Sequence, residues 1–309
     1  METVSSVPVF ARRNVAYAGA TLCCLLWGSS YPAIKSGYEL FAIATDDIPS
    51  KIVFAGYRFL FAGVLLLLFA MAQRKPIARL SQRQYGQIAI LGLTQTSIQY
   101  IFFYIGLAFT TGVKGSIMNA TGTFFSVLLA HLIYKNDRLS YNKSIGCVLG
   151  FAGVMLVNVN PSLLDFSFSM MGDGFVVLAA FILSASMLYG KRISQTVDPT
   201  VMTGWQLAFG GGVLVLGGYL TGGTLAVHSM KAAVLLGYLT LLSSIAFALW
   251  SVLLKYNRVS MIAPFNFVIP VAGTVLSAIF LGENILEMKY AIALVLVCSG
   301  IWWVNKPKA

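Results

Sequence analysis

Long apolar runs, separated by short polar segments, account for most of the chain. Ten such runs lie at 15–37, 52–72, 85–109, 112–134, 144–159, 174–190, 201–220, 232–254, 260–281 and 289–304. A helix needs about 20 mostly apolar residues to cross the hydrocarbon core of a bilayer. The runs contain Gly, Ser and Thr without the strict polar–apolar alternation of barrel strands. The pattern therefore predicts an all-α polytopic membrane protein with ten transmembrane helices.

The composition excludes the soluble classes of protein. Of the 309 residues, 58% are apolar and only 10% are charged, whereas a typical soluble domain has about 25% charged residues. The segments between the runs reach at most about 15 residues, which leaves no room for an ATPase domain. The motifs GxxxxGK[ST], HExxH and GxSxG are absent. We therefore expect a protein that is not an enzyme, requires no cofactor and does not hydrolyse ATP by itself.

The net charge of +11 is explained by membrane topology. Ten helices place both chain ends on one side, and fifteen of the 21 Lys and Arg residues fall on that side. Three others, Lys51, Lys231 and Lys289, fall on the opposite side. The positive-inside rule then predicts a multi-pass protein of the cell (inner or plasma) membrane with both termini in the cytoplasm. The expected partners are the lipid bilayer and a small-molecule substrate, with no nucleic acid, and a monomer and a homodimer fit the sequence equally well.

The two halves of the chain share a layout. The stretch 123–137 reads TFFSVLLAHLIYKND and the stretch 269–283 reads IPVAGTVLSAIFLGE; each ends in an acidic residue before another apolar run. We expect two five-helix repeats, at 14–159 and 172–304. An odd number of helices in a repeat inverts the second repeat in the membrane, and substrate sites of such proteins lie at the midplane between the repeats.

Several short motifs point to a known protein family. They are Trp27-Gly28-Ser29-Ser30, Arg58-Phe59 and Pro270 with Phe280-Leu281-Gly282-Glu283. With them the chain resembles the EamA-like branch of the drug/metabolite transporter superfamily over nearly its whole length. The resemblance implies ten helices, a central cavity and transport of small metabolites, commonly export. The first repeat departs from the pattern, because Phe124 and Asp137 stand where the second has Pro270 and Glu283.

Arg58 is the most informative charge within the runs. No Asp or Glu lies in the middle of a run, which disfavours the carboxylate relays of many pumps. An arginine at membrane depth must face the protein interior or water. Its partner is either structural, from Glu39, Asp46 or a free carbonyl, or it is a carboxylate or phosphate of the substrate.

Amide side chains give a second set of candidates. Gln95 and Gln99 stand four residues apart in the third run, and Asn119 belongs to a polar stripe in the fourth. An amide that faces lipid leaves its polar groups without partners, so these side chains must point inward. They either bind substrate or hold neighbouring helices together.

Two prolines mark sites where the helix backbone changes. Pro270 leaves the carbonyl of Asn266 without a donor, and Pro32 does the same near Trp27 and Ser30. Such a break is tolerated at membrane depth where it is buried in protein or lines a cavity; the alternative is a simple kink. We assign Pro32 and Pro270 to helix breaks or gating. Trp27, Ser30, Asn266 and, with weaker support, Trp250 are candidate substrate-binding residues.

These features favour a secondary transporter, an exporter or exchanger of a small polar, zwitterionic or anionic metabolite that alternates access to a midplane cavity. The alternative is a passive channel or facilitator for small solutes. Candidate binding residues are Gln95, Gln99, Asn119, Asn266, Trp27, Ser30, Arg58 and Trp250. No metal-binding spacing of His, Cys, Asp or Glu is present.

Overall fold

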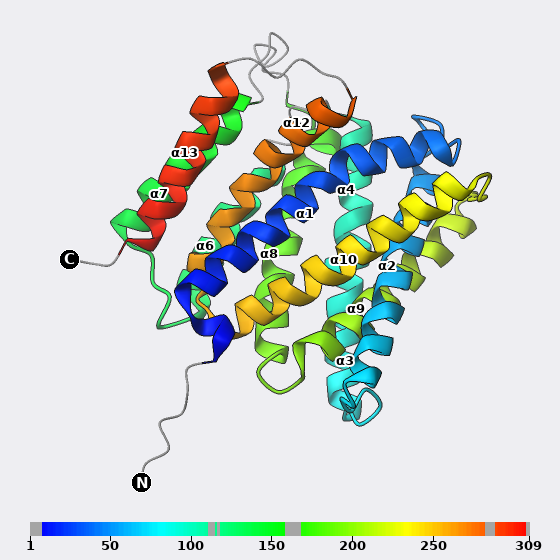
Figure 1. Cartoon of the computed structure of the whole chain (residues 1–309), viewed down its shortest axis with the longest axis horizontal. Helices are drawn as coiled ribbons and strands as arrows, with labels where there is room; N and C mark the ends of the chain where they lie inside the picture. Colours follow the sequence, from blue (N-terminus) through cyan, green and yellow to red (C-terminus); the bar gives the residue numbers. More distant parts are fainter. Residues whose placement is uncertain (1–7, 111–114, 116–117, 158–167, 282–287, 307–309) are drawn as a thin grey trace.

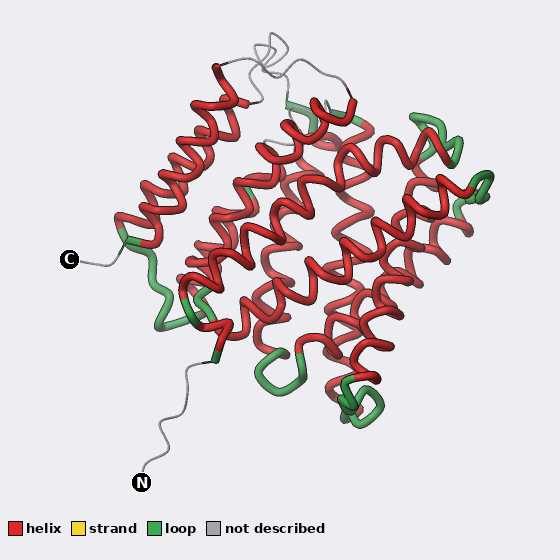
Figure 2. Tube along the Cα trace, in the orientation of Figure 1, coloured by secondary structure: helices red, strands yellow, loops and turns green. Residues whose placement is uncertain are grey.

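The computed structural model describes residues 8–110, 115, 118–157, 168–281 and 288–306 (Figure 1). Helices are the only regular secondary structure within these ranges (Figure 2). The elements in chain order are η1 (Val9–Ala11), α1 (Arg13–Leu40), α2 (Ile48–Ala72), α3 (Gln82–Leu91), η2 (Gly92–Ile98), α4 (Gln99–Ala108), α6 (Gly122–Ile133), α7 (Tyr141–Val157), η4 (Met170–Gly174), α8 (Phe175–Ile193), α9 (Pro199–Leu220), α10 (Met230–Tyr256), α11 (Val259–Ile262), η5 (Ala263–Phe267), α12 (Val268–Leu281) and α13 (Met288–Asn305). Helix therefore occupies most of the described part of every apolar run.

Short polar residues start several of these helices. Asp47 accepts a hydrogen bond from the backbone N–H of Ser50 at the start of α2, at 2.9 Å. At the start of α3, Ser81 and Gln84 exchange the two reciprocal bonds of a capping box. Asp198 precedes α9 in the same way, with Pro199 as the first helical residue. Each cap satisfies backbone N–H groups that a helix leaves open at its start.

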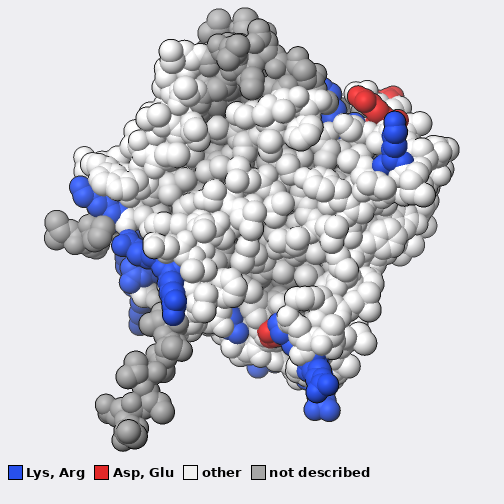
Figure 3. Space-filling model, in the orientation of Figure 1, with Lys and Arg blue, Asp and Glu red and all other residues white. Residues whose placement is uncertain are grey.

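The face of the bundle in Figure 3 has wide areas without charged side chains, and many large apolar side chains are exposed on the bundle. Leu22 and Leu25 of α1 are 47% and 45% exposed, and Leu216 of α9 is 62% exposed. Five helical segments are long and apolar enough to cross a bilayer: Ile48–Ala72, Gln82–Ala108, Met170–Ile193, Pro199–Leu220 and Met230–Tyr256. Shorter apolar helices cover Met118–Ile133, Val259–Gly273 and Ala291–Asn305. This is the surface and the helix inventory of a polytopic membrane protein.

Glycines allow α2 and α9 to pack with their backbones in close contact. A Cβ on Gly63 would lie 2.2 Å from the backbone nitrogen of Ala208, and one on Gly211 would lie 2.3 Å from that of Leu60. A second such pair is α7 with α13, where a Cβ on Gly146 would lie 2.5 Å from the carbonyl oxygen of Gly300. Small residues permit this approach between membrane helices.

The helix contacts follow the same pattern in both halves of the chain. α1 packs against α12 and α10, and α8 packs against α6 and α4. α10 contacts α2, and η2 contacts α9.

The start and the end of the described chain lie at the same end of the bundle (Figure 1). The Arg13 guanidinium donates to the carbonyl oxygen of Asn305 at 2.6 Å. The Asn257 amide donates to the carbonyl oxygen of Phe10 at 2.8 Å, which brings the end of α10 to the same place. We call this end the termini side.

Candidate functional site

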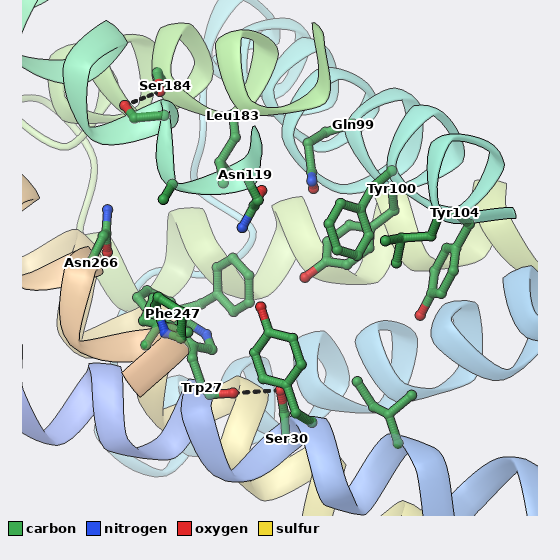
Figure 4. A pocket seen from close by; sticks show the side chains of 18 of the residues that line it. Trp27, Ser30, Gln99, Tyr100, Tyr104, Asn119, Leu183, Ser184, Phe247 and Asn266 are labelled. Atoms are coloured by element: carbon green, nitrogen blue, oxygen red, sulfur yellow. Dashed lines mark hydrogen bonds between the residues drawn. The ribbon is translucent and has the colours of Figure 1, made fainter. Parts of the chain in front are cut away.

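A cavity of about 330 Å³ lies inside the bundle (Figure 4). Its walls come from α1, α2, α4 and α6 of the first half of the chain and from α8, α10, η5 and α12 of the second half. Trp27 stands thirteen residues before the end of α1, and Arg58 stands ten residues after the start of α2. At a rise of 1.5 Å per residue these positions are about 15–20 Å from the helix ends. The cavity therefore reaches about the middle of a hydrocarbon core about 30 Å thick.

Seven of the residues singled out from the sequence line this cavity. They are Trp27, Ser30, Arg58, Gln99, Asn119, Asn266 and Pro270. They come from five regions that are distant in sequence, so only the fold brings them together.

Three amides converge on the cavity. The side chains of Gln99, Asn119 and Asn266 point into the space between the helices (Figure 4). Gln99 Oε1 and Asn266 Oδ1 are buried and have no hydrogen-bond partner within the part of the chain that the structure describes. A buried polar group without a partner costs about 1–3 kcal/mol. This group of amides is therefore suited to a polar ligand that supplies the missing bonds.

The polar stripe of the fourth run faces the same space. Asn119, Thr123 and Ser126 all line the cavity, whereas Ser116 lies outside the described residues. Ser184 of α8 also lines the cavity, but its hydroxyl bonds the carbonyl oxygens of Gly122 and Ala180, both at 2.8 Å. Its hydroxyl thus joins α8 to α6, which is the packing role that small polar residues have in membrane helices.

Arg58 is buried, at 4% exposure, in the wall formed by α2. Its Nε donates to the Ser243 hydroxyl of α10 at 2.6 Å, and its guanidinium lies 5.0 Å from the centre of the Phe59 ring. Neither Glu39 nor Asp46 forms an ion pair with it, and no other described carboxylate does so. Ser243 uses one of the five N–H donors of the guanidinium. The positive charge of Arg58 is thus available to the cavity.

Four tyrosines that were not singled out from the sequence form an aromatic wall of the cavity. Tyr31, Tyr38, Tyr100 and Tyr104 line the cavity, together with Lys35. The rings of Tyr100 and Tyr104 lie 6.1 Å apart on α4. The spacing of these two residues, one helical turn, was the available signal, because it places them on one face. A tyrosine also suits a lipid interface, so the spacing alone did not indicate a cavity.

Three residues singled out from the sequence do not line the cavity. Gln95 is buried but lies toward α8, with its Oε1 4.0 Å from the position that a Cβ on Gly190 would take. The prediction that Gln95 shares a face with Gln99 assumed an α-helix, whereas Gly92–Ile98 forms a π-helix. Gln95 belongs to this π-helix, whereas Gln99 begins the α-helix that follows it, and only Gln99 lines the cavity.

Trp250 and Pro32 lie beside the cavity. The Trp250 ring packs edge-on against Trp27 at 5.1 Å and so supports a lining residue from behind. Pro32 is buried inside α1, which continues without interruption from Arg13 to Leu40. Pro270 differs from Pro32, because a 3₁₀ segment, η5, precedes it in place of α-helix. This segment contains Asn266.

A membrane-embedded helical bundle with a mid-depth cavity between its two halves is typical of transport proteins. The family model of the EamA-like transporter family matches residues 14–159 and 170–306. The chain belongs to this family.

Similar proteins agree with this assignment. An uncharacterized transporter of Archaeoglobus fulgidus is 25% identical over 268 residues, which cover 85% of this chain and 88% of the relative. A probable amino-acid metabolite efflux pump of Salmonella typhimurium is 26% identical over 296 residues and 92% of both chains. A solved crystal structure with 17% identity has the same fold, with a TM-score of 0.79 over 94% of this chain and 96% of that one. The protein is therefore a multi-pass membrane protein of a transporter family and not an enzyme.

Proposed function

We propose that this protein is a secondary transporter, an exporter or exchanger of a small polar, zwitterionic or anionic metabolite. The observation that carries the proposal is the cavity at mid-depth whose walls come from both halves of the chain. A substrate held there can face either side of the membrane as the halves move relative to each other.

The repeated contact pattern supports two inverted five-helix repeats, at 14–159 and 172–304, and hence ten transmembrane helices. α2 packs against its counterpart α9, and α7 packs against its counterpart α13. In the same way, the contacts of α1 with α12 and α10 correspond to the contacts of α8 with α6 and α4. A two-fold relation of this kind is what alternating access requires, because the repeats exchange conformations when the cavity changes side.

We place the protein in the cell membrane with its termini in the cytoplasm. The termini side carries the basic residues Lys75, Lys143, Lys191 and Lys255, near helix ends or in connecting segments. Lys51 lies at the opposite end, near the start of α2. The excess of positive charge on the termini side supports the cytoplasmic orientation.

The cavity chemistry favours a substrate with a negative or zwitterionic group. Arg58 supplies a positive charge without a described carboxylate partner, and none of the described lining residues is Asp or Glu. A ligand carboxylate is a suitable partner for a guanidinium. The name of the relative in Salmonella typhimurium, a probable amino-acid metabolite efflux pump, is consistent with a substrate of this kind.

Replacement of the cavity amides tests the proposal. We expect Gln99→Ala, Asn119→Ala and Asn266→Ala each to lower solute counterflow into proteoliposomes about threefold to tenfold per folded protein, because each removes a hydrogen bond to the substrate. The matched control is Gln206→Ala, which removes a buried amide that bonds Thr96 at 3.5 Å and does not line the cavity.

The same assay separates a transporter from a passive channel. Solute on the far side accelerates uptake through a carrier, since the loaded cavity returns faster than the empty one. A channel or facilitator without an alternating site shows no such acceleration. Flux that does not saturate, with no counterflow in the unmodified protein, would reject the transporter in favour of the channel. Counterflow that all three cavity variants retain at full rate would place the substrate site elsewhere.

A further inference from the structure

A second pocket, of about 400 Å³, lies on the termini side of the bundle. It is formed by the ends of α8 and α10, by the segment that joins α6 to α7, and by the segment that joins α10 to α11. The two cavities have no described lining residue in common. Transport through the central cavity therefore does not account for this pocket.

Four basic side chains converge on the pocket. They are Lys191, Arg192, Lys255 and Arg258. The positive-inside rule explains why basic residues are frequent on this side of the bundle. It does not explain why four of them, from two different helix ends, line one concave site.

The carboxylate in the wall of the pocket is already neutralised. Asp137 is 2% exposed and accepts a hydrogen bond from Lys143 Nζ at 2.8 Å. It also accepts bonds from the backbone N–H of Ser260, at 3.0 Å, and from the Ser260 hydroxyl. Asp137 thus joins the α6–α7 segment to the start of α11 and has little charge left to offset the cations of the pocket.

One of the four cations has a structural role. Lys191 Nζ donates to the carbonyl oxygens of Leu254 and Asn257 at the end of α10, the second at 2.6 Å. Backbone carbonyls at a helix end lack donors within the helix, so Lys191 completes them. Arg192, Lys255 and Arg258 form no ion pair with a carboxylate in the described part of the chain. Three positive charges therefore remain for a ligand.

We propose that this pocket binds a phosphate-bearing anion, either the headgroup of an anionic phospholipid or free phosphate. Two guanidinium groups offer paired donors that match phosphate oxygens, and a lysine adds a third charge. The pocket lies at helix ends, where Tyr134 and Tyr256 also line it. Aromatic side chains of this kind are enriched at headgroup depth, and basic pockets between membrane helices bind anionic headgroups.

The test measures the midpoint of thermal unfolding of the full-length protein in nanodiscs of neutral phosphatidylcholine. Phosphatidylglycerol is added to one series of nanodiscs and inorganic phosphate to the buffer of another. A ligand that binds the folded state raises the midpoint. The Arg192→Gln/Arg258→Gln variant removes two of the three free charges, and we expect it to weaken binding about fivefold per charge. The Arg79→Gln/Arg83→Gln variant is the matched control, because it removes equal charge from two exposed positions on the same side, one just before α3 and one in its first turn.

Stabilisation by phosphatidylglycerol alone, lost in the pocket variant and retained in the control, supports the site with a lipid headgroup as its occupant. Stabilisation by inorganic phosphate with the same dependence supports the site with free phosphate. The proposal is overturned if neither anion raises the midpoint, or if the control variant loses as much of the rise as the pocket variant. If the double variant does not fold, the Lys255→Gln variant takes its place. It removes one charge, and we expect a smaller loss of the rise in midpoint.

Discussion

The close contact between α2 and α9 leads to a sharp prediction at two adjacent glycines. Gly211 faces α2, and a Cβ placed on it would lie 2.3 Å from the backbone nitrogen of Leu60 and 2.9 Å from the carbonyl oxygen of Gly56. Gly212 stands next to it on α9, and a Cβ there would have no atom within 4 Å. The substitutions Gly211→Ala and Gly212→Ala therefore add the same methyl group to one helix in two different environments.

The expected magnitude follows from these distances. Non-bonded heavy atoms rest about 3.5–4.0 Å apart, so Gly211→Ala forces α9 about 1 Å away from the α2 backbone or strains both helices. Overpacking of this kind costs about 1–3 kcal/mol. Both substitutions gain the same helix propensity, about 1 kcal/mol. The difference between the variants therefore isolates the overlap, and we expect Gly211→Ala to be about 2 kcal/mol less stable than Gly212→Ala.

The assay uses the buried cysteines of the protein. Cys23 and Cys24 are 0% exposed and Cys147 is 3% exposed, so a fluorogenic thiol reagent reports their release on heating. The exposed Cys298 is first replaced in a Cys298→Ser background. A difference of about 2 kcal/mol corresponds to about 5 °C in the unfolding midpoint. Equal midpoints for the two variants would show that α2 and α9 do not pack with their backbones in contact.

Two further predictions concern charge. Burial alone would raise the pKa of Asp137, but the hydrogen bonds from Lys143 and Ser260 and the Lys143 charge lower this pKa below its ordinary value of 3.8; its stabilisation is therefore present above that value and lost as the pH falls through the folded pKa. We expect Asp137→Asn to lose about 3 kcal/mol at neutral pH, with a difference in unfolding midpoint from the unmodified protein that shrinks below pH 3.8; a constant difference would contradict the assignment. The described wall of the central cavity contains no Asp or Glu, so we expect uptake into liposomes to change little with an imposed pH gradient. Accumulation that a protonophore abolishes would refute this expectation.

The helical architecture could be predicted from the sequence because the underlying physics is local. A run of about 20 apolar residues has few alternatives to a buried or membrane helix, since its backbone groups must be bonded internally. Irregular segments depend on tertiary packing instead. The π-helix at Gly92–Ile98 and the 3₁₀ segment at Ala263–Phe267 were not predicted. Asn266 was singled out through Pro270, yet the change of helix type begins at Ala263, where Pro264 is a second proline.

The sequence argument for the candidate site is strongest where a side chain that faces lipid would be energetically expensive. Gln99 and Asn119 have amides that hydrocarbon cannot satisfy, and both side chains lie in the cavity. The same argument places Gln95 inside the protein, where it is 7% exposed. It does not say whether an inward side chain meets a cavity or another helix, and Gln95 meets α8.

Aromatic residues can lie in several environments at little energetic cost, so the same argument does not locate them. The Tyr100 and Tyr104 rings are apolar and each hydroxyl needs one partner, so lipid interface, helix contact and cavity wall all suit a tyrosine. Trp250 is of the same kind and fills the space behind Trp27. The position of a side chain can thus be predicted from its identity when placing it in lipid is costly, and not when it suits several environments. Amides and Arg58 therefore mark the interior of the bundle from sequence, while the tyrosines that form the aromatic wall are identified only when the helices of both halves are assembled.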